Sequence, residues 1–145
     1  MIQLLPRPPA PLIGLCLTLI SSFAPLALKA ADAQAFDRYT QGRTIHFAWE
    51  GQAYGVERYL PGRRVIWSFL DGRCVEGDWS PQESATGPQI CFTYEGRGEA
   101  QCWDYEITGE GLSVSIQRGD GPPLRLTEQL GVQEEMFCLG PEVGV

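Results

Sequence analysis

The sequence predicts an all-β domain, an eight-stranded antiparallel up-and-down barrel with a short N-terminal helix. From Thr44 onward, short runs of β-branched and aromatic residues alternate with polar ones, as in strands with one apolar and one polar face. Turn pairs that contain glycine separate these runs at short, regular intervals. Strands that follow one another in this way fit an up-and-down barrel better than a sandwich, which usually needs Greek-key crossovers. A strongly curved open sheet is the alternative architecture.

The first part of the chain is typical of a secretory signal peptide. Arg7 lies in a short basic start, an apolar run follows, and small residues end the run at 30–35. Cleavage after Ala33 fits the small-residue rule best, with Ala30 and Ala35 as alternative sites.

This cleavage divides the chain into a signal peptide over 1–33 and a single disulfide-bonded β-barrel domain over 34–145. A membrane anchor is the competing interpretation, since the apolar run approaches the ~20 residues that a bilayer needs. Two prolines interrupt the run, which favours the signal peptide. We therefore expect a periplasmic or secreted protein with no membrane attachment after signal cleavage.

The mature part is acidic. Cleavage removes Arg7, Lys29 and Asp32, which leaves 9 basic and 17 acidic side chains and a net charge of about −8. The mature part has no basic stripe to follow a phosphate backbone, so nucleic acid is not expected as a partner. An acidic surface is also repelled by anionic lipid, which argues against peripheral membrane binding.

The secondary-structure elements follow from the same patterns. A helix is predicted over Asp32–Gln41, because Gly42 follows where a helix commonly ends. The segment 80–88 contains two prolines and is the connection long enough to form an open loop. The strands are expected over 44–49, 52–59, 63–70, 74–79, 89–95, 100–107, 111–117 and 123–128.

Turn positions predict which side chains face the interior. The turns on either side of the second strand put Val56 opposite Ile45 and Trp67, so Arg58 points into the barrel with Val56. The side chains of Tyr105 and the other aromatic residues of the later strands share the same face.

The register after the third strand has two solutions. A two-residue turn would put Glu76 and Asp78 on the inner face. A three-residue loop would instead pair Phe69 with Val75 and send both carboxylates outward together with Cys74. Burying unpaired carboxylates costs several kcal/mol, so we favour the second register.

The cysteines predict two disulfides. Cys16 leaves with the signal peptide, and an even number in a small exported domain is typical of a disulfide framework. The turn between their strands places Cys91 opposite Cys102, which leaves Cys74 to pair with Cys138. A four-thiolate zinc site is the alternative, but no C-x2-C pair is present.

The aromatic inner face is the candidate binding site. An eight-stranded barrel either fills its interior with side chains or holds one small ligand, and a filled core is the commoner alternative. An inward arginine could hold an anionic head group through two hydrogen bonds. The candidate ligand-binding residues are Arg58, Trp67, Tyr94, Trp103 and Tyr105.

No catalytic residue, cofactor or metal site is predicted. His46 is expected on the polar face of the first strand as a surface or hydrogen-bonded residue, without the ligands a metal would need. Glu76 and Asp78 are the nominees for a glycosidase pair, but they face inward only in the disfavoured register. We therefore expect a protein that is not an enzyme.

Several segments resemble a family of uncharacterised small exported bacterial proteins. The resemblance covers nearly all of the mature chain, and it implies an exported, lipocalin-like β-barrel domain without an assigned activity. The segments that carry it are Tyr54–Trp67, Gly77–Trp79, Gln89–Tyr94, Cys102–Tyr105 and Cys138–Val145.

Two hypotheses of function follow. The first is a non-enzymatic binding module that holds a small apolar or amphipathic ligand in the barrel. The alternative is a protein-binding module, such as an inhibitor of an envelope hydrolase, that contacts its partner through the segment 80–88 and the acidic surface.

Overall fold

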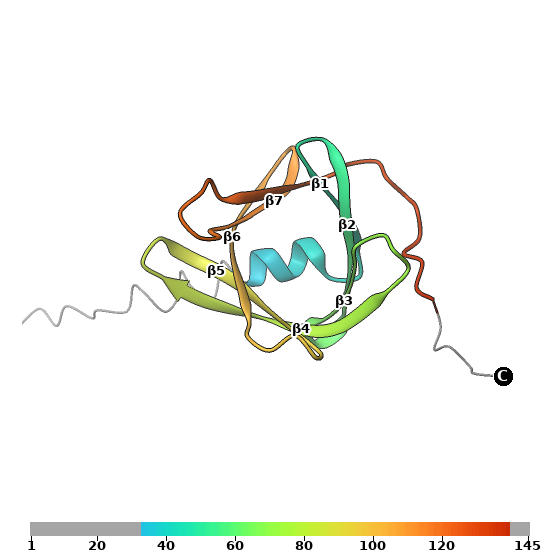
Figure 1. Ribbon diagram of the computed structural model, residues 1–145, viewed down its shortest axis with the longest axis horizontal. Helices are drawn as coiled ribbons and strands as arrows, with labels where there is room; N and C mark the ends of the chain where they lie inside the picture. Colours follow the sequence, from blue (N-terminus) through green and yellow to red (C-terminus); the bar gives the residue numbers. More distant parts are fainter. Residues whose placement is uncertain (1–32, 140–145) are drawn as a thin grey trace, which may run out of the picture.

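The computed structural model describes residues 33–139 and confirms the predicted barrel. Eight antiparallel strands pair in chain order, and β1 pairs with β8 to close the barrel (Figure 1). The expected signal peptide lies outside the described residues up to position 32, as does the cleavage site at Ala30. Ala33 and Ala35 lie in the described helix, and nothing in the structure tests cleavage there, so all three sites stay predictions. The strands are β1 (Thr44–Trp49), β2 (Gln52–Leu60), β3 (Arg64–Ser68), β4 (Cys74–Ser84), β5 (Gly87–Tyr94), β6 (Gln101–Thr108), β7 (Gly111–Ile116) and β8 (Leu124–Glu128).

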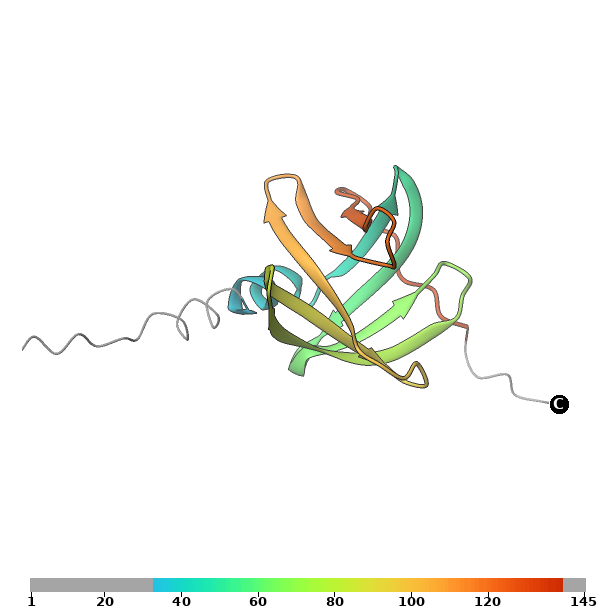
Figure 2. The same cartoon turned by 60° about the vertical axis from the view of Figure 1, so that its left-hand side comes forward.

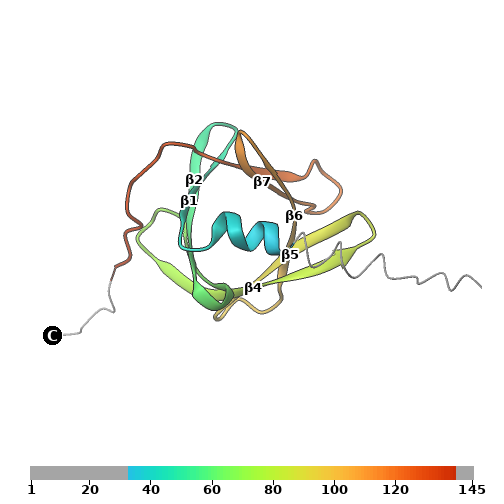
Figure 3. The ribbon, with the colours of Figure 1, turned by 180° about the vertical axis from the view of Figure 1, so that it is seen from behind.

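A helix over 33–40 closes one end of the barrel, close to the predicted bounds. Figure 2 shows it at this end, and Figure 3 shows it from behind, across the ring of strands. Phe36 is fully buried, and its ring makes edge contacts with Tyr59, Trp79 and Tyr105 at centroid distances of 5.9, 5.0 and 5.2 Å. Such edge-to-face packing is a favoured geometry for aromatic rings. The helix therefore plugs the barrel with an aromatic side chain.

A buried carboxylate fastens the helix to the last strand. Glu128 accepts hydrogen bonds from the Tyr39 hydroxyl, the Arg43 guanidinium and the backbone N–H of Leu112. The Arg43 guanidinium also lies over the Tyr39 ring, 4.4 Å from its centroid. Because each oxygen of Glu128 has partners and one partner is cationic, its burial is well compensated.

The later strands pair as predicted. Cys91 lies opposite Cys102, and Tyr105 lies opposite Val114. Between β3 and β4, the side chains point to the predicted sides of the sheet. The paired residues differ from the prediction by two positions, because Val75 lies opposite Trp67 and not Phe69. The connection therefore runs over five residues, 69–73, in place of three.

The segment 80–88 was wrongly expected to be a loop. It forms the outer half of the β4–β5 hairpin, in which Ser84 pairs with Gly87 and Pro81 with Ile90. β4 pairs with β3 over 74–78, and β5 pairs with β6 over 89–92. Pro81 and Pro88 lie outside these ranges, where one edge of each strand has no partner, so the sheet tolerates both prolines.

The register of β2 differs from the prediction by one residue on both sides. A bulge leaves Tyr54 without an opposite residue, so Glu57 lies opposite Ile45. On the other side a 3₁₀ turn over Pro61–Arg63 replaces a two-residue turn, so Glu57 also lies opposite Trp67. A one-residue slip moves every side chain to the other face, and Glu57 therefore points inward.

The C-terminal segment 129–139 crosses the outside of the barrel (red in Figures 1 and 2). His46, on the outer face of β1, contacts the Glu134 carbonyl through Nε2 at 2.9 Å, which fits the expected hydrogen-bonded histidine. The segment ends at the disulfide between Cys74 and Cys138, beside a hydrogen bond from Leu139 N–H to the Gly72 carbonyl.

Candidate ligand cavity

The barrel is hollow at the end opposite the helix. A cavity of about 440 Å³ lies there, and its mouth is formed by the connections after β3, β5 and β7. This volume is within the ~300–1,000 Å³ typical of small-molecule sites. Its lining is largely aromatic and aliphatic, with two arginines, a glutamine and a glutamate: Phe47, Tyr54, Glu57, Tyr59, Trp67, Phe69, Phe92, Tyr94, Arg97, Gln101, Trp103, Val114, Ile116, Arg118 and Leu126.

Two strand glycines make room for the cavity's aromatic rings. A Cβ on Gly55 would lie 2.4 Å from the Trp67 ring, and one on Gly77 would lie 2.8 Å from the Tyr94 ring. Both distances are shorter than carbon atoms tolerate, so the rings can lie against the strands only because these positions have no side chain. The Trp67 ring then packs edge-on to Phe69, with centroids 5.2 Å apart.

Glu57 is the buried polar group of the cavity. Its side chain is 3 % exposed, and its two oxygens accept hydrogen bonds from Tyr94 Oη at 2.6 Å and Tyr59 Oη at 3.2 Å. Among the described residues, no arginine, lysine or histidine forms an ion pair with Glu57. The carboxyl group therefore has hydrogen-bond partners but no counter-charge.

Burial sets the protonation of this group. Desolvation raises the pKa of Glu57 to about 7, although the hydrogen bonds from Tyr94 and Tyr59 act to lower it. Burial, followed by the nearby charge of Glu57, raises the pKa of both tyrosines well above the usual value. The tyrosines therefore stay hydroxyl donors, while the carboxyl group changes charge near neutral pH.

The mouth of the cavity carries two arginines. Arg97, after β5, and Arg118, after β7, are both exposed. The Arg97 guanidinium lies over the Phe69 ring, 5.4 Å from its centroid. The cavity thus has the carboxyl group of Glu57 inside, which is anionic or neutral, and two cationic guanidinium groups at its rim.

The structure brings three of the five predicted binding residues together. Trp67, Tyr94 and Trp103 line the cavity. Tyr105 also lies inside the barrel, but at the plugged end, where its ring contacts Phe36. The inward placement of Arg58 is wrong: it is exposed on the outer face, because the bulge and the 3₁₀ turn move β2 by one residue.

Glu57, Arg97 and Arg118 were not among the predicted site residues. A signal for Glu57 was present in Gly55, since a glycine within a strand often marks a bulge. The two arginines lie in turns, where strand alternation gives no direction for a side chain.

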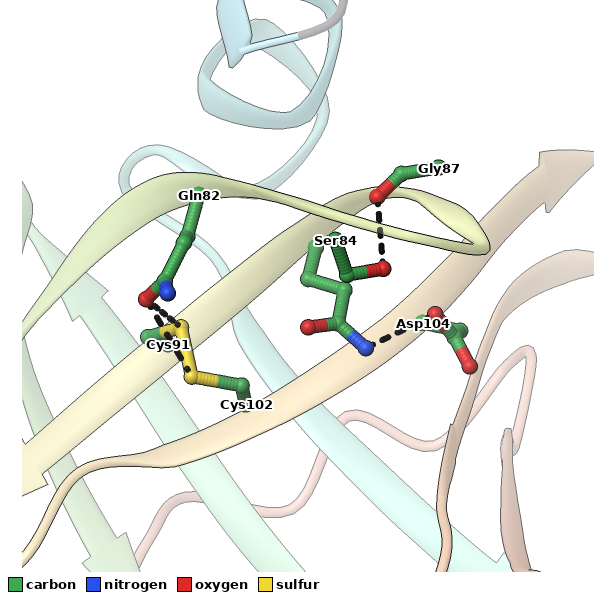
Figure 4. The surroundings of a disulfide bond; sticks show 7 residues. Gln82, Ser84, Gly87, Cys91, Cys102 and Asp104 are labelled. Atoms are coloured by element: carbon green, nitrogen blue, oxygen red, sulfur yellow. Dashed lines mark hydrogen bonds between the residues drawn. A yellow bond between two sulfur atoms is a disulfide. The ribbon is translucent and has the colours of Figure 1, made fainter.

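The predicted disulfides are confirmed, and both lie outside the cavity. Around Cys91–Cys102, the Gln82 Oε1 atom lies 3.1 Å from the Cys91 sulfur (Figure 4). This is a contact and not a hydrogen bond, because a disulfide sulfur carries no proton. Nearby, the Gln89 amide donates to Asp104 across the same outer face at 3.0 Å.

The other candidates for chemistry are dispersed. Glu76 and Asp78 are exposed on the outer face as predicted, and Glu76 accepts a hydrogen bond from Arg64 at 2.8 Å. Within residues 33–139, His, Cys, Asp and Glu side chains form no group of three that could hold a metal ion. The same stretch holds no helix of the length and apolarity needed to span a membrane.

Comparisons with protein-family models, with curated proteins and with solved structures find no match to this chain, so the resemblance to small exported bacterial proteins stays a prediction.

Proposed function

We propose that the protein is an exported, non-enzymatic binding module that holds one small apolar or amphipathic ligand in its barrel. The observation that carries this proposal is the cavity itself. A barrel of this size could fill its interior with its own side chains, yet here one end keeps about 440 Å³ open. An apolar body would contact the aromatic walls, and a polar group would meet Glu57 inside or Arg97 and Arg118 at the mouth.

A fluorescence titration tests the proposal. We expect the neutral probe N-phenyl-1-naphthylamine to bind one site per chain, with a rise in its emission and quenching of the tryptophans. Gln101→Trp places a large ring in the mouth and should weaken the probe by at least about tenfold. Thr93→Trp adds the same ring on the outer face, between two lining residues, and should leave probe binding unchanged.

Two results would contradict a binding cavity. One is a wild-type protein that binds no probe, and the other is equal weakening by both tryptophan variants. Native mass spectrometry of protein purified from its own envelope adds a second readout, since a bound ligand should appear as a constant mass increment that Gln101→Trp reduces.

A protein-binding module, such as an inhibitor of an envelope hydrolase, is the second candidate. The β4–β5 hairpin favours it, because its tip extends past the neighbouring strands and exposes Ala85 and Thr86. Immobilised protein should then retain one specific partner from envelope extract, and Ala85→Arg should abolish the retention. Recovery of no specific partner would count against this candidate.

A further inference from the structure

We infer that the ligand of this cavity carries a protonated amine, which it presents to Glu57. The inference rests on the proposed function and specifies the class of ligand. Its starting point is a carboxyl group that is 3 % exposed, faces the cavity, and has no cationic partner among residues 33–139.

The hydrogen bonds to Glu57 leave part of its capacity unused. A carboxylate offers about four lone-pair sites, and the hydroxyls of Tyr59 and Tyr94 occupy one on each oxygen. Elsewhere in the barrel, the buried Glu128 has three donors, one of them the cationic Arg43. Glu57 lacks the equivalent cation, and the open space beside it is where a ligand could supply one.

The walls of the cavity suit the same chemistry. Tyr59, Tyr94, Trp67 and Trp103 surround the space that Glu57 faces, and aromatic rings attract cations most strongly where water is excluded. A charged amine would gain both the ion pair and these ring contacts. An alcohol would gain a hydrogen bond alone, and a carboxylate would be repelled by an ionised Glu57.

The arginines at the mouth do not contradict this assignment. Arg97 and Arg118 are exposed, so solvent and salt screen their repulsion of an approaching cation. The formal net charge of the chain, −7, favours the approach of cations over longer distances. An anionic ligand would instead pair with the two arginines and remain at the rim.

A series of three matched probes tests the inference in the wild-type protein. Phenylbutylamine, phenylbutanol and phenylbutanoic acid share one apolar body and differ in the terminal group. At pH 8 we expect the amine to bind at least about tenfold more tightly than the alcohol, and the acid to bind most weakly. Calorimetry or displacement of N-phenyl-1-naphthylamine gives the three affinities.

The pH profile of amine binding gives a readout specific to Glu57. An alkylamine stays protonated well above neutral pH, so the affinity should rise between pH 5 and pH 8 as Glu57 ionises. The groups that face Glu57 are Tyr59 and Tyr94, with Arg97 and Arg118 along the same cavity and the Arg43–Glu128 pair beyond Tyr59. Burial and the nearby Glu57 hold the pKa of both tyrosines well above this range, so their hydroxyls stay neutral.

Glu57→Gln should remove the preference for the amine over the alcohol and flatten the pH profile. Glu76→Gln is the matched control, because it makes the same change on the outer face, and it should keep both. If Glu57→Gln does not fold, the probe series and the pH profile of the wild-type protein still decide.

The outcomes separate this inference from the proposed function. Binding of N-phenyl-1-naphthylamine or phenylbutanol without a preference for the amine would overturn the inference and leave the binding module intact. Tighter binding of the acid would overturn it in favour of the arginines at the mouth. Failure of every probe to bind would overturn both.

Discussion

Glu57 and Arg58 are neighbours in the chain, but the barrel places them in opposite environments. Glu57 faces the cavity with two tyrosine hydroxyls, while Arg58 is exposed to solvent. The difference comes from one extra residue in β2 at Tyr54 and one in the turn at Arg63. The charge of the interior is therefore the opposite of the one that simple alternation from the turns predicts.

The raised pKa of Glu57 has a consequence for stability. A carboxyl group whose pKa is about 7 when folded, against an ordinary value of 4.5, binds its proton more tightly in the folded state. Its contribution to the free energy of unfolding is fully present below about pH 4.5 and is lost as the pH rises through 7.

Comparison with Glu57→Gln isolates this contribution, because the contributions of the other titrating groups are the same in both proteins and cancel in the difference. We expect the stability of wild type relative to Glu57→Gln to fall between pH 4.5 and 8 by on the order of 3 kcal/mol. Urea unfolding at several pH values measures it. A difference that does not change with pH, or that grows as the pH rises, would contradict the buried carboxyl group.

Gly55 is predicted to be essential for the packing of Trp67. In Gly55→Ala, the new methyl would lie 2.4 Å from the Trp67 ring and 2.9 Å from the Ser68 carbonyl oxygen, which belongs to the backbone and cannot rotate away. Overpacking of this kind costs about 1–3 kcal/mol, and we expect this loss in urea unfolding.

Gly109→Ala is the control for this change. A Cβ at Gly109 meets nothing within 4 Å, and its φ is not positive, so the substitution should leave the stability within about 0.5 kcal/mol. Equal effects at the two glycines would show that Trp67 does not lie against Gly55.

At the scale of elements, the N-terminal helix makes the barrel different at its two ends. Phe36 fills the end near Tyr105, and the opposite end keeps the cavity. Phe36→Ala should therefore lower the free energy of unfolding by about 3–5 kcal/mol, as expected for a fully buried phenyl ring.

Arg38→Ala provides the comparison within the same helix. Arg38 is exposed, and alanine favours the helix at least as well, so this variant should unfold within about 0.5 kcal/mol of wild type. A loss for Phe36→Ala no larger than this would mean that the helix does not close the barrel.

Elements with regular pairing could be predicted from the sequence, and those set by local exceptions could not. Turn arithmetic gave the β5–β6 and β6–β7 registers, because no bulge lies in either ladder. It failed at β2, where the register depends on a bulge and a 3₁₀ turn, and there it misplaced Arg58 and missed Glu57. Prolines led to the wrong expectation for 80–88, because their tolerance depends on which strand edges lack a partner.

At the scale of the whole molecule, two disulfides link segments of the chain on the outer surface of the barrel. Cys91–Cys102 joins neighbouring strands 11 residues apart in sequence, whereas Cys74–Cys138 spans 64 residues and ties the C-terminal segment to the start of β4. Export would place both bridges in an oxidising compartment, where they form and persist.

The spans of the two bridges predict their relative contributions. On the chain-entropy model, the longer loop is worth about 4 kcal/mol and the shorter about 3 kcal/mol. Domains of this size have a total stability of roughly 5–15 kcal/mol, so the two bridges together account for a large share of it. We expect Cys74→Ser with Cys138→Ser to lower the urea midpoint more than Cys91→Ser with Cys102→Ser.

Complete reduction should leave the barrel only marginally stable. The reduced protein should lose its near-ultraviolet circular dichroism at a much lower urea concentration than the oxidised protein, and peptide mapping without reduction verifies the starting pairs. If reduction changes the midpoint little, the aromatic core and the helix plug alone stabilise the barrel. If the Cys91–Cys102 variant is the weaker of the two, the C-terminal segment is already constrained in the unfolded chain, and the longer loop then has less entropy to lose.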